Sequence, residues 1–111
     1  MTRPPMPTGQ IDLLLLSIVA QRPAHGYAII NDLRLLSGGA FDLPEGSIYP
    51  ALYRLERQGL VTSSEARVDG RRRRIYRVTR SGRTALRERR DAWRVQVRNM
   101  ESVLRGEPHH A

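Results

Sequence analysis

The sequence contains no cysteine and no lysine. Without cysteine the chain can form no disulfide, no thiolate zinc site and no thiol nucleophile. Without lysine, all 19 basic residues are arginines, and the planar fork of arginine can grip a phosphate or a guanine with two hydrogen bonds. Codon bias in a GC-rich genome also favours arginine over lysine. The composition therefore indicates that the chain can bind phosphate or guanine, but it does not locate a binding site.

A long apolar run is also absent. The longest, residues 11–20, is interrupted by Asp12 and Ser17, whereas a membrane-spanning helix needs about 20 apolar residues. Arg3 precedes this run, as in a secretory signal, but Asp12 breaks the apolar segment and no small-x-small cleavage site follows. We therefore expect neither a signal peptide nor a membrane span, and we expect a cytoplasmic protein.

The sequence shows no constellation of catalytic residues. Its only histidines are His25, His109 and His110, and the last two lie in a predicted loose tail, so a shared metal site with His25 is not expected. There is no glycine-rich phosphate loop and no carboxylate pair at helical spacing. We expect a protein that is not an enzyme and that needs no metal or cofactor.

Positive charge is what the chain has in excess. Its 111 residues fit one domain, and 40% hydrophobic with 27% charged residues is ordinary for a globular protein. The formal net charge is +8. A domain this basic usually meets a polyanion, with nucleic acid the first possibility and an acidic membrane surface the second.

The spacing of apolar residues predicts four helices and one β-hairpin. The first helix has apolar residues on most sides and stops before Pro23. The third is expected to begin at the N-cap Ser47, with Pro50 in its first turn. Asp69-Gly70 is a two-residue turn signal. The predicted elements are helices over residues 10–21 and 26–37, a third helix from Ser47 to Gly59, a hairpin over 60–78 and a helix over 79–104.

The order α-α-α-β-β-α predicts a mainly α fold with a small β-hairpin, namely a winged helix-turn-helix followed by a long C-terminal helix. The predicted parts are a flexible N-terminal arm over residues 1–9, a winged-helix domain over 10–78, a C-terminal dimerisation helix over 79–105 and a loose tail over 106–111.

The third predicted helix carries a polar and aromatic face that suits a DNA major groove. Arg54 could bridge guanine O6 and N7, and Tyr53 could contact a phosphate or a thymine methyl group. An ordinary solvated face is the alternative, although such faces favour Glu and Gln over exposed tyrosines. The face consists of Pro50, Tyr53, Arg54 and Arg57, flanked by Ser47 and Tyr49.

The predicted hairpin has four consecutive arginines just beyond its turn. With Asp69-Gly70 at the tip, Val61 pairs with Val78, Ser63 with Tyr76 and Glu65 with Arg74, so Arg74 can form an ion pair with Glu65. The three residues nearest the tip are better placed to straddle a phosphate backbone or enter a minor groove. A solvated tip is the alternative. These three are Arg71, Arg72 and Arg73.

These segments resemble the PadR-like family of bacterial regulators over roughly residues 13–104. The resemblance implies a dimeric repressor of the short subgroup whose third helix reads a dyad in promoter DNA. It also implies that Ser47, Tyr49 and Tyr53 lie near DNA and that the wing arginines contact phosphates. The matching segments are Pro23-Ala24-His25-Gly26-Tyr27, Glu45-Gly46-Ser47-Ile48-Tyr49-Pro50-Ala51-Leu52, Arg54-Leu55-Glu56, Gly59-Leu60-Val61, and Gly70-Arg71-Arg72-Arg73 with Tyr76 and Val78-Thr79.

The segment His25-Gly26-Tyr27 opens the second predicted helix and has two interpretations. In the structural one, Gly26 permits close helix packing and Tyr27 fills a gap. In the functional one, His25 or Tyr27 contacts a DNA phosphate at the helix N-terminus.

The last predicted helix has an apolar stripe that so small a body cannot cover. A second copy of the chain would cover it and set two recognition helices about 34 Å apart, which predicts a palindromic operator. Some short PadR-like proteins bind flat aromatic compounds between tryptophans, so Trp93 is a candidate stacking platform; otherwise it is interface core. The stripe consists of Leu86, Trp93, Val97, Met100 and Leu104.

Three functions remain open at this point. The first is a repressor released by a small aromatic effector. The second is a winged-helix module for protein or RNA interactions without operator recognition, although such modules are usually less basic. The third is a DNA binder without an effector, which the sequence does not distinguish from the first.

Overall fold

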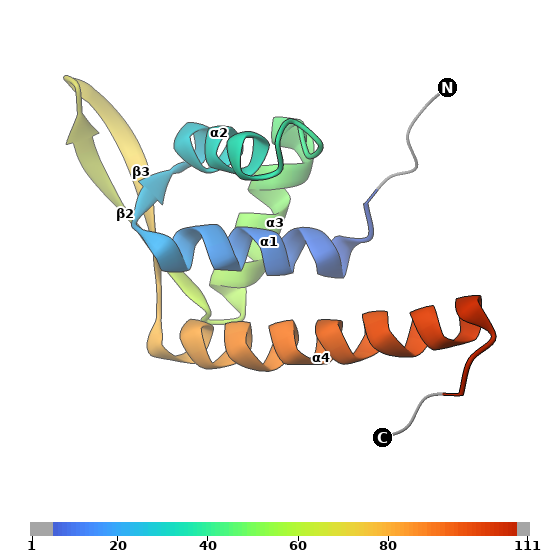
Figure 1. The fold of residues 1–111 in the computed structure, drawn as a ribbon. Coiled ribbons are helices and arrows are strands. Elements are labelled where there is room, and N and C mark those ends of the chain that lie inside the picture. The colour runs from blue at the N-terminus through green and yellow to red at the C-terminus, as the bar shows by residue number, and fades with distance from the viewer. Residues whose placement is uncertain (1–5, 109–111) are drawn as a thin grey trace.

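The computed structural model describes residues 6–108 and confirms the predicted winged-helix order (Figure 1). One further element, a two-residue strand, precedes the second helix. The elements are α1 (Thr8–Gln21), β1 (Ala24–His25), α2 (Gly26–Leu36), α3 (Glu45–Arg57), β2 (Val61–Val68), β3 (Arg71–Val78) and α4 (Arg80–Arg105).

The sheet is antiparallel, with strand order β1-β3-β2. The predicted register is confirmed: Val61 pairs with Val78, Ser63 with Tyr76 and Glu65 with Arg74. The turn residues Asp69 and Gly70 have φ of 53° and 77°, the left-handed values that a type I′ turn requires. Strand β1 adds Ala24 beside Tyr76. We did not predict it, because two residues are too few to show the alternation of a strand.

Helix α1 is the centre of the core and packs against α2, α3, α4 and β3. The predicted apolar face of α3 is confirmed, since all four of its residues are fully buried. The base of the hairpin closes the core through Val61 and Tyr76. Leu36 is exposed, because it lies in the last turn of α2, where few neighbours reach it. The buried α3 residues are Ile48, Ala51, Leu52 and Leu55.

Two predicted helix starts were wrong. Helix α1 begins at Thr8, so it includes the last two residues of the predicted arm. Helix α3 begins at Glu45 rather than at Ser47, after Pro44, and no side chain caps it. Pro44 already has a helical φ of −75°, and a first-turn glutamate interacts favourably with the helix dipole, so this start needs no Ser N-cap. Pro50 consequently lies in the second turn.

Helix α4 is anchored at its first turn and projects at its far end. The Thr79 hydroxyl accepts a hydrogen bond from the Gly82 amide at 3.0 Å and donates one to the Gly59 carbonyl at 2.7 Å. Gly82 lies so close to the Leu60 carbonyl that an added methyl group would overlap it. The second half of α4 extends past α1 (Figure 1), and Gly106, in a left-handed conformation, ends the helix.

No helix within residues 6–108 has the length and apolar character needed to cross a membrane. The first five residues of the predicted arm, and residues 109–111 of the predicted tail with His109 and His110, lie outside the described part of the chain.

Candidate nucleic-acid interface

A groove of about 520 Å³ runs between the outer face of α3 and the hairpin. Three of the residues that we predicted for the third helix line it. We did not predict the residues that line this groove from the hairpin, although the predicted register placed Ser63 and Tyr76 on one face. The lining residues are Tyr49, Tyr53, Glu56 and Arg57 from α3, and Ser63, Arg74 and Tyr76 from the hairpin.

Tyr53 and Arg57 form the exposed ridge of α3. The side chain of Tyr53 is 62% exposed, and the Arg57 guanidinium lies over its ring at 5.8 Å from the centroid. Pro50 is exposed one turn earlier, and Ser47 is half-buried. A flat ring with a cation above it presents both an apolar surface and a hydrogen-bond donor to the base edges of a duplex.

Arg54 lies apart from this ridge. Its Nη2 and Nε donate to the two carboxylate oxygens of Asp12 at 2.8 and 3.3 Å, so one edge of the guanidinium is occupied. The side chain of Asp12 is only 9% exposed and that of Arg54 is 37% exposed. The hydrogen bond to Asp12 raises the pKa of the Arg54 guanidinium above its usual value. Arg54 therefore ties α3 to α1, and its predicted contact with guanine stays a prediction.

Tyr49 connects α3 to the start of α2. Its ring lies against Gly26, where a Cβ atom would come within 2.6 Å of the Tyr49 Cε1. Burial is the main cause that raises the pKa of the Tyr49 hydroxyl, which keeps it a neutral donor. The packing interpretation of Gly26 is confirmed. Tyr27 does not fill a gap, because half of its side chain is exposed.

The hairpin arginines point to both sides of the sheet, as strand geometry requires. Arg73 lies over the Tyr27 ring at 5.3 Å from the centroid, which joins the wing to α2. Arg72 donates to Glu65 at 2.8 Å, whereas Arg74 approaches Glu65 only to 3.9 Å. We predicted the directly opposite pair, but the diagonal neighbour on the same face makes the closer contact.

The other two arginine contacts complete the description of the wing. Arg74 donates to the Ser63 hydroxyl at 3.0 Å. The side chain of Arg71 is exposed and forms no hydrogen bond or ion pair within the described residues. Arg71 is therefore a cation near the wing tip that can reach a phosphate at no cost to an existing contact.

His25 is the N-cap of α2. Its Nδ1 accepts a hydrogen bond from the Ala28 amide at 3.3 Å. The Nδ1 that accepts is unprotonated, so the proton of the neutral ring is on Nε2. His25 can thus stabilise the helix and still present one donor at the helix N-terminus.

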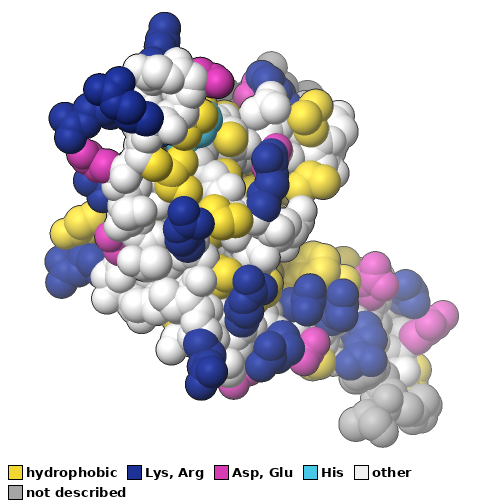
Figure 2. Space-filling view, turned by 90° about the vertical axis from the view of Figure 1, so that its left-hand side faces the viewer, with side chains coloured by type: hydrophobic (Ala, Val, Ile, Leu, Met, Phe, Trp, Pro, Cys, Tyr) yellow, Lys and Arg dark blue, Asp and Glu magenta, His cyan; other side chains and the backbone are white. Residues whose placement is uncertain are grey.

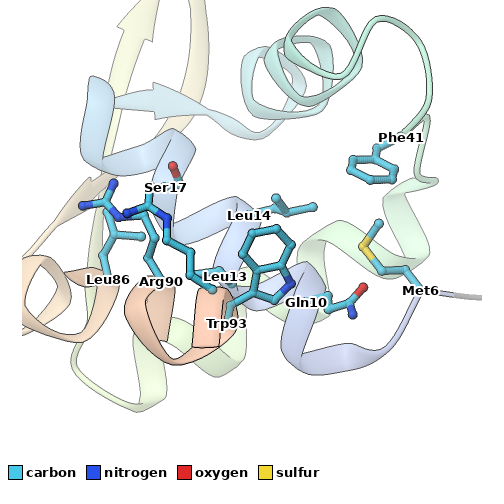
Figure 3. A pocket seen from close by; sticks show the side chains of 10 residues that line it. Met6, Gln10, Leu13, Leu14, Ser17, Phe41, Leu86, Arg90 and Trp93 are labelled. Atoms are coloured by element: carbon cyan, nitrogen blue, oxygen red, sulfur yellow. The ribbon is translucent and has the colours of Figure 1, made fainter. Parts of the chain in front are cut away.

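Trp93 lines a second, largely apolar pocket of about 250 Å³ between α1 and α4. Figure 3 shows its indole turned toward Leu14, with Phe41 and Met6 at the far end of the space. Beyond this pocket Val97 is half-buried, and the end of the predicted stripe is bare, since Met100 is 55% and Leu104 is 80% exposed. The pocket residues are Met6, Gln10, Leu13, Leu14, Ser17, Phe41, Leu86, Arg90, Trp93 and Arg94.

Comparison with known proteins identifies the family. The sequence profile of the PadR-like family of transcriptional regulators matches residues 15–88. The chain belongs to the PadR-like family. The resemblance seen in the sequence is thereby confirmed, and so is the expectation that this is not an enzyme, because the relatives are transcriptional regulators.

Individual relatives agree with this assignment. The transcriptional regulator Rv3488 of Mycobacterium tuberculosis is 39% identical over 101 residues, which cover 91% of this chain and 89% of the relative. The crystal structure of smu.1704 from Streptococcus mutans superposes with a TM-score of 0.83 at 27% identity, covering 99% of this chain and all of the other. A PadR family transcription regulator from Clostridium difficile gives a TM-score of 0.75 at 32% identity, covering 85% and 97% of the two chains.

Asp12 lies beside the candidate site, and we did not predict its partner from the sequence. A single acid inside an apolar helix needs a partner when it is buried. Its partner Arg54 lies 42 residues away, on α3, beside the exposed ridge. The ion pair therefore helps to hold α3 in position against α1.

Removing Asp12 should destabilise the fold. We expect Asp12→Ala to lower the free energy of unfolding by about 1–3 kcal/mol, because Arg54 loses its partner while half-buried and water solvates only part of its charge. Urea unfolding measures the change. Asp32→Ala is the matched control, because it breaks an ion pair whose arginine, Arg22, is far more exposed, and it should cost under about 1 kcal/mol. Equal losses for the two variants would contradict the role given to Asp12.

Proposed function

We propose that this PadR-like protein is a homodimeric, sequence-specific repressor that acts in the cytoplasm on a palindromic promoter site. The observation that carries the proposal is the exposed Tyr53–Arg57 ridge of α3 beside an arginine-bearing hairpin. A ridge of this kind fits a major groove, and the hairpin fits the adjacent phosphate backbone.

Every residue predicted to contact DNA has a place in the proposed complex except Arg54, which is paired with Asp12. Pro50, Tyr53 and Arg57 face the base edges, while Ser47 and Tyr49 lie at the flanks. Arg71 contacts a phosphate directly, and Arg72 exchanges Glu65 for one. At the start of α2, His25 offers its Nε2 donor to the backbone, and Tyr27 holds Arg73 beside it.

The bare stripe of α4 supports the dimer. Met100 and Leu104 lie on the same side of the helix as Trp93, and nothing within the described residues covers them. Exposed apolar patches of this kind mark interaction sites, and a second copy of the same stripe gives a closed, two-fold pair. Two α3 ridges on one side of such a pair meet successive major grooves.

Selection from random duplexes, followed by titration of the selected site, tests DNA recognition. We expect a dyad to be recovered. Arg57→Ala should cost about 1–3 kcal/mol in binding and relax base preference, because it removes a base contact. Arg71→Ala should weaken all duplexes alike and lower the salt slope by about one, because it removes a phosphate contact.

Arg34→Ala is the control, because Arg34 is an exposed arginine of α2 bonded to Asn31. It should leave both the affinity and the salt slope unchanged. Equal affinity for every duplex, or a selection without a dyad, would favour a protein- or RNA-interaction module instead.

Self-association is tested by mass measurement in solution. We expect a dimer at micromolar concentration. Leu104→Glu should weaken it at least about tenfold, because the two-fold axis brings two charges into one apolar seam. Leu35→Glu, at an exposed leucine of α2, should leave the mass unchanged. If wild type is a monomer at this concentration, two α3 ridges cannot meet successive major grooves and the proposed dimer is wrong.

The Trp93 pocket is the proposed effector site. An aromatic compound that stacks on the indole would occupy the space between α1 and α4 and shift the separation of the two recognition helices. Titration with planar aromatic dyes should quench or shift the fluorescence of Trp93, which is the only tryptophan. An unchanged emission spectrum throughout the titration would leave Trp93 a packing residue and the protein a constitutive DNA binder.

A further inference from the structure

Helix α4 carries a line of arginines that DNA reading by α3 and the hairpin does not use. Successive members are three or four residues apart, so they fall within an arc of about 80° along the helix. The line spans about 22 Å at 1.5 Å per residue. We call this surface the arginine row; it consists of Arg83, Arg87, Arg90, Arg94 and Arg98.

The arginine row is exposed and its charge is not neutralised. None of its members forms an ion pair within residues 6–108, although Glu88 and Asp91 lie on the same helix. Arg83 reaches only the carbonyl of Ala20, at 3.5 Å. Like charges one turn apart destabilise a helix. The arginine row costs stability and no ion pair within the described residues offsets this cost. We therefore expect it to bind an external anion.

The arginine row lies away from the wing. The hairpin tip and α2 are at one end of the molecule and α4 is at the other (Figure 1). Helix α1 lies between α2 and α4 and packs against both. Figure 2 shows arginine side chains, in dark blue, gathered along the lower part of the molecule, which α4 forms. A straight duplex bound by the α3 ridge and the hairpin therefore does not run along the arginine row.

The spacing of the row fits a nucleic-acid backbone. One guanidinium per helical turn of 5.4 Å gives about two-thirds of the linear charge density of one DNA strand, which carries about one charge per 3.4 Å of axis. A membrane surface fits less well. An interfacial helix must insert its apolar face, whereas α1 covers the first half of the α4 stripe at Leu86 and Trp93.

From this geometry we propose that the arginine row binds the phosphate backbone of a second DNA duplex, so that the protein bridges two DNA segments. The proposal rests on the proposed function for the first duplex only. The row reads no bases, since its side chains lie on a straight helix face without the tyrosine ridge of α3. The second duplex can therefore have any sequence.

A capture experiment with the full chain tests the bridge. An immobilised duplex with the selected dyad is loaded with protein, and a fluorescent duplex of unrelated sequence is added at low salt. Wild type should retain the fluorescent duplex. The threefold variant Arg83→Gln, Arg87→Gln, Arg98→Gln leaves the Trp93 pocket residues Arg90 and Arg94 in place. It should bind the immobilised duplex within about twofold of wild type and lose at least about tenfold in capture.

Two controls keep the result specific. Lysine at the same three positions keeps the charge and should restore capture. The glutamine variant relieves repulsion within α4 and is expected to fold; circular dichroism and a mass measurement check this. The single change Arg87→Glu, which should also reduce capture, gives the readout if the threefold variant is damaged. Undiminished capture by a folded variant would overturn the proposal, because the two wings of a dimer would then form the bridge.

A wing variant separates this proposal from DNA reading by α3. Arg71→Gln, Arg72→Gln, Arg73→Gln removes the hairpin cations, so its residual binding to an unrelated duplex should depend on the arginine row and vanish with it. Such binding would support the row even if no dyad is selected. Flotation with phosphatidylserine vesicles that requires the row, together with no capture of the second duplex by wild type, would overturn the DNA assignment in favour of a lipid surface.

Discussion

The burial of helix α1 is the constraint on which the rest of the structure depends. Apolar side chains cover most of its circumference, so exposure of any face would leave hydrophobic surface in water. Helices α2, α3 and α4 and strand β3 each cover part of it. The one charged residue on α1 that this arrangement buries, Asp12, is neutralised by Arg54 of α3. The core and the orientation of the recognition helix are thus set by the same contacts.

The candidate DNA surface follows from this packing. Because the inner face of α3 is fully buried against the core, its outer face must carry Tyr53 and Arg57 into solvent. The hairpin is held at its base by Val61 and Tyr76, so its arginine-bearing tip extends beside α3 rather than folding onto it. Tyr49 against Gly26, and Arg73 over Tyr27, connect the ridge, the wing and the start of α2 into one surface.

Helix α4 differs from the other helices because α1 is too short to cover it. Its first half closes the Trp93 pocket on α1, and its second half presents an apolar stripe with the arginine row alongside. One helix therefore offers two neighbouring surfaces of opposite character.

The sequence by itself determined the type and order of the helices and the hairpin, the register of β2 and β3, and the family, because periodicity and turn chemistry are properties of single segments. The placement of Tyr53 and Arg57 on the outer face of α3 followed from the same helical periodicity. Only the tertiary structure decided that Arg54 forms an ion pair with Asp12, that Arg72 contacts Glu65, and that Ala24 joins the sheet. These partners come from different segments, and the periodicity of one segment cannot say which side chain of another will meet it in space.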